Sequence, residues 1–248
     1  MPYAQVRDLK LYYEEFGVGE PILFLHSHFS RGLLAFSSQI LPFQGKYRCI
    51  FPDFRGHGRT QCDDLTWDSR RIAQDMADFL DALGIPSAHL FGYSCGAWVG
   101  LYLAAGHPEK VRSLVTVGGG AYPRPEGADS FLPDALLREG KARFIQEIAS
   151  RHADAHRGDW KTYLEQTVAD WKAHPSLTDR EWRAITCPAF CINGERDPFG
   201  TCAELKAKLP QAKTYEVKGS GHRPHFVTEQ AKELNAMILE FLAGLETE

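Results

Sequence analysis

Short apolar runs alternate with longer amphipathic segments along most of this chain. Six such runs cover residues 21–25, 48–51, 89–91, 111–117, 189–192 and, more weakly, 214–217. Runs of this length without polar alternation are typical of strands that are buried on both faces of a sheet. Residues 6–13 instead alternate with a period of two, which predicts an N-terminal hairpin.

Helical periods lie between these runs. One stripe, followed by Gly84 as a candidate C-cap, consists of Ile72, Met76, Phe79 and Leu83. A second stripe near the end of the chain consists of Val227, Ala231, Leu234, Ile238, Phe241 and Leu245. Strands that alternate with helices predict an α/β fold, with a mostly parallel central sheet of about eight strands and helices on both faces.

One region breaks this alternation. No convincing strand occurs from residue 123 to residue 183, and helical periods there cover residues 131–137, 143–155, 159–172 and 179–185. Pro123, Pro125 and Gly127 mark its start, and Pro188 lies near the return to the sheet. We therefore expect a helical lid, residues 123–183, inserted into a core formed by residues 1–122 and 184–248.

Charge and composition narrow the possible partners. The chain has 28 Lys and Arg against 32 Asp and Glu, a net charge of −4, so no basic surface is expected for nucleic acid or anionic lipid. No apolar stretch approaches the roughly 18 residues of a membrane helix, and no signal peptide is visible. We expect a cytoplasmic monomer or homodimer that acts on a small-molecule substrate.

The six cysteines are irregularly spaced, which favours free thiols over disulfides. No cluster of cysteine and histidine has the spacing of zinc ligands, so we expect no metal and no other cofactor.

The strongest chemical signal is the segment Gly92-Tyr93-Ser94-Cys95-Gly96, which matches G-x-S-x-G between an apolar strand and a helix rich in small residues. In that context the serine occupies a strained strand-to-helix turn that exposes its hydroxyl, and the helix N-terminus directs N–H groups at an oxyanion. We expect Ser94 to be the nucleophile. The thiol of Cys95 is a rival by chemistry, but its position after the turn favours a buried side chain.

A serine hydroxyl needs a base, and the base needs a carboxylate. His222 follows the last weak strand on a loop with Gly219 and Gly221, and it is our expected base; His225, three residues on, is the alternative. Asp197 follows the strand at residues 189–192, at the carboxyl end where α/β sheets place their sites. Glu195 competes with Asp197 but suits the surface better.

These three motifs together resemble the α/β-hydrolase superfamily over essentially the whole chain. Two further segments agree: Leu25-His26-Ser27-His28-Phe29 resembles the His-Gly-x loop of the family, and residues 52–60 resemble its D-x-R-G-x-G-x-S segment. The resemblance implies that Ser94 is the nucleophile, Asp197 the acid and His222 the base. It assigns a structural turn, rather than a catalytic role, to His57.

The resemblance also implies an oxyanion hole formed by the backbone N–H groups of Cys95 and His28. Ser27 departs from the family, because glycine is usual at its position, so the N–H of Ser27 is an alternative donor. We expect the substrate pocket to draw on side chains of the loops and the lid: Ser27, Phe29, Tyr93, Phe131, Phe144 and Trp160.

The expected reaction is hydrolysis of a small to medium carboxylic ester or lactone through an acyl-enzyme. Thioesters and carbon–carbon bonds are alternatives on the same three residues, and a small-molecule receptor with little turnover is the alternative of another class. A serine at the turn argues against epoxide hydrolase and dehalogenase chemistry, for which the similar enzymes carry an aspartate there.

Overall fold

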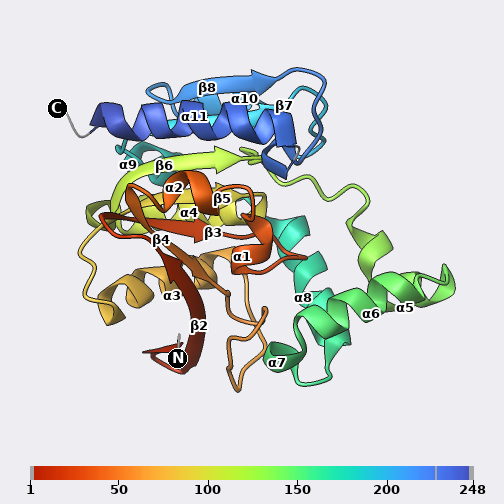
Figure 1. The fold of residues 1–248 in the computed structure, drawn as a ribbon. Helices are drawn as coiled ribbons and strands as arrows, with labels where there is room; N and C mark the ends of the chain where they lie inside the picture. The colour runs from red at the N-terminus through yellow and green to blue at the C-terminus, as the bar shows by residue number, and fades with distance from the viewer. Residues whose placement is uncertain (1–2, 227, 246–248) are drawn as a thin grey trace.

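A computed structural model describes residues 3–226 and 228–245 (Figure 1). At its centre lies a sheet of eight strands. The strands are β1 (Tyr3–Val6), β2 (Leu9–Phe16), β3 (Glu20–Leu25), β4 (Tyr47–Pro52), β5 (Ala88–Tyr93), β6 (Val111–Val117), β7 (Ala189–Gly194) and β8 (Lys213–Val217). The predicted hairpin is present and longer than expected, because β1 and β2 extend beyond residues 6–13 at both ends.

The strand order across the sheet is β1-β2-β4-β3-β5-β6-β7-β8. β1 pairs with β2, and β2 with β4, in antiparallel fashion, and the other pairs are parallel. The mostly parallel sheet predicted from the sequence is therefore confirmed. Because β3, β5, β7 and β8 run in the same direction, the loops that follow them emerge at one edge of the sheet.

Helices flank the sheet on both faces, as predicted. They are α1 (Gly32–Ala35), α2 (Ile40–Phe43), α3 (Ser69–Ala82), α4 (Cys95–Gly106), α5 (Pro133–Arg138), α6 (Ala142–Arg151), α7 (Ala153–His156), α8 (Trp160–Ala173), α9 (Asp179–Ala184), α10 (Cys202–Lys208) and α11 (Thr228–Leu245). Three 3-10 turns are η1 (Pro108–Lys110), η2 (Ala128–Phe131) and η3 (Pro224–Phe226). Val227, which begins the C-terminal stripe, lies outside the described residues.

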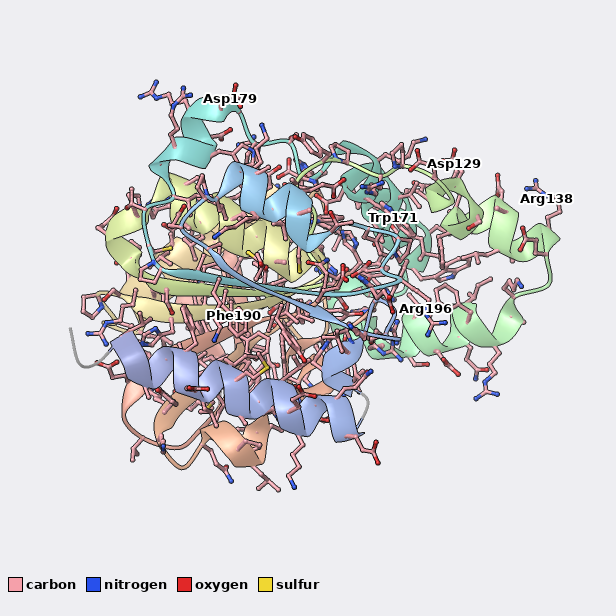
Figure 2. All side chains as sticks on the ribbon, turned by 90° about the horizontal axis from the view of Figure 1, so that it is seen from above. Asp129, Arg138, Trp171, Asp179, Phe190 and Arg196 are labelled. Atoms are coloured by element: carbon pink, nitrogen blue, oxygen red, sulfur yellow. The ribbon has the colours of Figure 1, made fainter. Side chains whose placement is uncertain are left out.

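The hydrophobic core has two parts, one on each face of the sheet. On one face, α11 packs with α1 and α2 over a phenylalanine-rich layer that includes Phe24, Phe51 and Phe91. On the other face, α3 and α4 contribute residues such as Met76 and Leu101. Figure 2 shows this layering from above, with α11 on one side of the sheet and α4 and α10 on the other. Burial on both faces explains the continuous apolar runs of the strands.

The helices between β6 and β7 divide into two groups. α5, α6, α7 and α8 project to one side of the sheet, beyond the carboxyl ends of its strands (Figure 1). α9 instead packs against α4, and in Figure 2 Asp179 at its start lies at the opposite end of the molecule from Arg138 of α5. The boundary of the lid at residue 183 stays a prediction.

No helix within residues 3–226 and 228–245 is long and apolar enough to cross a membrane.

Candidate active site

Ser94 stands at a sharp turn between β5 and α4. Its backbone has φ 56° and ψ −122°, a conformation that is uncommon for a residue with a side chain and that costs of order 1–3 kcal/mol. The Ser94 N–H donates to Val117 O of the neighbouring strand at 2.9 Å, which holds the turn in place. The serine hydroxyl thus stands at the edge of the sheet where the loops gather.

Glycines on either side make this turn possible. A Cβ at Gly92 would lie 2.3 Å from Gly96 O, and a Cβ at Gly96 would lie 1.9 Å from Leu25 O. Both distances are far below van der Waals contact, so any side chain would force the strand and the helix apart. The two glycines of the G-x-S-x-G pattern are therefore explained by the close approach of α4 to β3 and β5.

Ser94, His222 and Asp197 form one continuous hydrogen-bonded chain. The hydroxyl of Ser94 lies 2.9 Å from His222 Nε2, and His222 Nδ1 lies 3.0 Å and 3.1 Å from the two carboxylate oxygens of Asp197. Because the carboxylate can only accept, Nδ1 donates to it and Nε2 remains free to accept the serine proton. Three residues that are distant in the sequence are thus brought together as predicted.

Neighbouring residues hold the Asp197 and His222 side chains in place. The side chain of Asp197 is fully buried and accepts a hydrogen bond from Phe199 N–H at 2.9 Å. Phe199 packs edge-on against the His222 ring at a centroid distance of 4.5 Å, and Tyr93 lies against the same ring at 5.2 Å. The carboxylate is therefore screened from water, and the imidazole has little freedom to turn.

The alternative acid and base lie elsewhere. Glu195 is exposed and accepts from Gly219 N–H at 2.8 Å, which braces the loop before His222. The ring of His225 is fully buried, and its Nε2 lies 3.2 Å from Ala35 O. Burial lowers the pKa of His225 to about 3, so it stays neutral and fills the core.

Cys95 and His57 are also buried away from the serine hydroxyl. Burial raises the pKa of the Cys95 thiol well above its ordinary value, which leaves it neutral and a poor nucleophile. Burial lowers the pKa of His57 to about 4, and its Nδ1 lies 2.8 Å from Arg55 O. Both side chains serve packing.

The loop after β3 is held so that its amides keep one orientation. His26 Nδ1 and Ser30 N–H donate to Ser27 O at 2.9 Å and 3.1 Å, while Phe54 N–H donates to His26 Nε2 at 3.0 Å. Ser27 C=O and His28 N–H belong to the same planar trans peptide group, so the His28 N–H points in the opposite direction to Ser27 C=O. The Cys95 N–H is the first amide of α4, a position with no partner inside a helix.

Ser27 fits this loop without strain. Positive φ at residues other than glycine is found at Arg7, Ser94 and Arg157 in the described chain, so Ser27 does not adopt the left-handed conformation that favours glycine. The serine that departs from the family pattern is therefore accommodated by an ordinary backbone conformation.

A cavity of about 160 Å³ opens beside Ser94 and His222. Its other lining residues are Ser27, His28, Phe29, Tyr93, Trp98, Phe131, Trp171, Phe199 and Arg223. Four of the six expected pocket residues are in this set: Ser27, Phe29, Tyr93 and Phe131. Phe144 instead packs one layer behind, with its ring 5.6 Å from Phe29 and 5.7 Å from Phe131, and Trp160 packs against the core.

Several lining residues were not among the six expected pocket residues. Trp98 lies one helical turn after Ser94 on α4, so its side chain is on the same face of the helix as Ser94. This spacing could have identified Trp98 as a lining residue. Phe199 follows Asp197 by two positions, and Arg223 follows His222 directly. Trp171 lies on α8 (Figure 2) and lines the cavity, and nothing in its local sequence separates it from the other tryptophans.

Within the part of the chain that the structure describes, no group of three or more His, Cys, Asp or Glu side chains is arranged to hold a metal ion. All six cysteines are free.

Comparison with known proteins agrees with this geometry. A model of the alpha/beta hydrolase family matches residues 22–237. A protein of Azorhizobium caulinodans named as a carbamate hydrolase is 39% identical over 132 residues, which cover 53% of this chain and 48% of that protein. The chain thus aligns with about half the length of that relative.

Two solved structures share the fold over nearly the full length. A carboxylesterase of Nitrososphaera gargenis has a TM-score of 0.80 at 21% identity and covers 98% of each chain. The enol-lactonase of Burkholderia xenovorans has a TM-score of 0.75 at 21% identity, over 98% of this chain and 100% of that one. At these identities the likeness describes the fold.

Proposed function

Because the chain belongs to the α/β hydrolase family, we propose that it is a serine hydrolase that cleaves a small to medium carboxylic ester or lactone. The observation that carries this proposal is the continuous contact from Ser94 Oγ through His222 to Asp197, at 2.9 Å and 3.0 Å. A hydroxyl, an imidazole and a buried carboxylate in this order are the parts that acyl transfer requires.

The proposed reaction has two halves. Ser94 Oγ attacks the substrate carbonyl as His222 Nε2 takes its proton, and the oxyanion is stabilised by the N–H groups of Cys95 and His28. His222 then gives the proton to the leaving oxygen, and the carbon–oxygen bond breaks to leave an acyl-enzyme. A water molecule, deprotonated by His222, attacks this ester; the bond to Ser94 Oγ then breaks, His222 returns the proton to Oγ, and the acid is released. Asp197 remains ionised throughout and stabilises the imidazolium.

The neighbourhood of the cavity supports a compact, largely apolar substrate. Six aromatic side chains wall it: Phe29, Tyr93, Trp98, Phe131, Trp171 and Phe199. Phe131 and Trp171 come from residues 123–183, which we propose form the cap that sets specificity. An engineered apolar cavity of about 150 Å³ accommodates benzene, so a cavity of about 160 Å³ suits an acyl group of similar size.

Hydrolysis of a series of p-nitrophenyl esters, from acetate to octanoate, tests this proposal. We expect steady turnover, greatest for the short acyl chains, and a loss on the order of 10⁴-fold or more in Ser94→Ala. Ser37→Ala, at an exposed serine outside the site, is the matched control and keeps full activity. Steady turnover that survives Ser94→Ala would exclude the proposed mechanism.

Assays on the same purified proteins distinguish the alternative substrate classes and the alternative role as a receptor. Thioester and carbamate analogues of the preferred ester are compared directly; the carbamate is included because a relative carries that name. A receptor would bind the esters and complete a single slow turnover, whereas we expect many turnovers per protein molecule.

A further inference from the structure

The cavity contains a second histidine paired with a second buried aspartate. His28 lies on the loop after β3, and its Nε2 is 2.7 Å from Oδ2 of Asp170 on α8. The side chain of Asp170 is fully buried, and that of His28 is 7% exposed. This pair joins residues 142 positions apart and plays no part in the proton transfers described above.

The hydrogen bonds around Asp170 define which nitrogen of His28 is free. Ser69 N–H donates to Oδ1 at 2.6 Å, and Ser69 Oγ–H donates to Oδ2 at 2.7 Å. Burial by itself would raise the pKa of Asp170, but hydrogen bonding and charge from His28, with Ser69, hold that pKa below its ordinary value. The carboxylate is therefore ionised and accepts from Nε2–H, so Nδ1 is the ring nitrogen that remains free to bind a substrate.

That free nitrogen belongs to a residue in the wall of the substrate cavity. His28 lines the cavity together with Ser94 and His222, and no hydrogen bond from residues 3–226 or 228–245 reaches its Nδ1. The Trp98 ring packs edge-on against it at 5.5 Å, and the buried Trp98 Nε1–H also lacks a partner within the same residues. A free ring nitrogen and an unsatisfied donor thus occupy neighbouring rings in a cavity that is otherwise mainly aromatic.

We propose that His28, oriented by Asp170, is a specificity-determining residue that binds a hydroxyl group on the acyl part of the substrate. This inference rests on the proposed function. The substrate class is then a hydroxy-ester or hydroxy-lactone. A hydroxyl can either donate a hydrogen bond to Nδ1 or accept one from it, and it is neutral, so its burial costs little once it is bonded. A carboxylate would be repelled by ionised Asp170.

Two esters that differ in one group test this directly: methyl 3-hydroxybutanoate and methyl 3-methylbutanoate, in which a methyl replaces the hydroxyl. Released methanol is measured for both. For the wild-type protein we expect kcat/KM to favour the hydroxy-ester by about tenfold or more, the worth of one well-made hydrogen bond. Monomethyl succinate is the third substrate, and we expect it to be the poorest.

The key variant is His28→Phe. Its ring fills a similar space, its backbone N–H is retained and Ser69 still donates to Asp170, but no nitrogen replaces Nδ1, so we expect the ratio between the two esters to fall to about one. Asp170→Asn is the second variant and should weaken the preference in the same direction. Phe29→Leu is the control: it lines the same cavity without a polar atom, so we expect it to change both rates in parallel and leave the ratio alone.

The results of these assays distinguish failure of this inference from failure of the proposed function. Hydrolysis that depends on Ser94 but shows no preference for the hydroxyl overturns this inference and leaves the proposed function standing. Retention of the wild-type ratio by His28→Phe, with thermal unfolding showing a folded protein, also overturns it, and so does a preference for the succinate half-ester. Hydrolysis of all three esters that persists in Ser94→Ala contradicts the proposed function itself.

Discussion

At the scale of single residues, the tightest constraint in the molecule is the space around the Ser94 turn. The Cβ of a residue at position 96 would stand 1.9 Å from Leu25 O, so the end of β3 would have to move. This same strand end begins the loop that carries His28. One backbone contact therefore controls both the serine turn and the proposed oxyanion donors.

We predict that Gly96→Ala lowers the free energy of unfolding by about 3 kcal/mol or more, since overpacking at a rigid backbone contact cannot relax cheaply. It should also remove most ester hydrolysis. Urea unfolding and kcat measured on the same preparation check this. Gly106→Ala, at the other end of α4, is the control: its Cβ meets nothing within 4 Å, so we expect stability close to wild type.

The sequence was most informative at residues whose role depends on local spacing. Ser94, Asp197 and His222 were predicted because each follows an apolar strand with turn residues beside it, and strand ends meet at one edge of a parallel sheet. The partner of the His28 side chain was not predictable. Asp170 lies 142 residues away, inside a helix whose periodicity shows which face is buried but not what it contacts.

At the scale of elements, three residues of α6 and α8 hold the loop after β3. Arg151 donates to Phe29 O, Tyr163 donates to His28 O, and Asp170 binds the His28 ring. These contacts link the proposed cap to the proposed oxyanion loop. We infer that the cap positions that loop as well as covering the cavity.

We predict that Tyr163→Phe, which deletes the hydroxyl bonded to His28 O, lowers kcat on the order of tenfold, with KM changed much less. The reason is that a loosened loop weakens stabilisation of the transition state more than it weakens substrate binding. Steady-state kinetics on the preferred ester provide the measurement. Tyr122→Phe, at a half-exposed tyrosine, is the control, and equal effects of the two variants would contradict the positioning role.

Two predicted helices match the structure closely, and three short helices were not predicted. The predicted segments 159–172 and 179–185 correspond to α8 and α9 within one residue at each end. α1, α2 and α10, which were not predicted, span seven residues or fewer and so offer few positions in which a helical period can be seen. The predicted segment 143–155 is divided at His152, whose buried Nδ1 accepts from Gly58 N–H at 2.9 Å; that tertiary contact leaves no local trace in the sequence.

At the scale of the whole molecule, alternation of strands and helices predicted a mostly parallel sheet with two covered faces, because only that architecture buries so many two-sided strands. The order of the strands was not predictable in the same way. β4 lies between β2 and β3, and this follows from packing between distant segments rather than from any pattern within them.

Buried histidines make stability depend on pH. Burial lowers the pKa of His57 to about 4 and that of His225 to about 3, and it lowers the pKa values of His26 and His152 well below the ordinary one. The unfolded chain therefore takes up more protons than the folded chain as the pH falls below about 6.5. Asp53, whose pKa burial raises to about 6, acts in the opposite direction.

We predict that the free energy of unfolding falls as the pH is lowered from 7 to about 4, because the four histidines outnumber the one opposing carboxyl. Each buried histidine contributes about 1.4 kcal/mol per pH unit between its unfolded and folded pKa. Urea unfolding at pH 7, 6 and 5 measures the slope. A free energy that stays constant or rises over this range would show that these rings are protonated in the folded protein.

The central claim is that the hydroxyl of Ser94 is the nucleophile, activated by His222. The most direct measurement is the site of covalent labelling by a fluorophosphonate, mapped by mass spectrometry of the digested protein. We predict one adduct, on Ser94, formed rapidly in the wild-type protein and very slowly in His222→Asn. An adduct on a different residue, or labelling of Ser94 at the same rate without His222, would contradict the account.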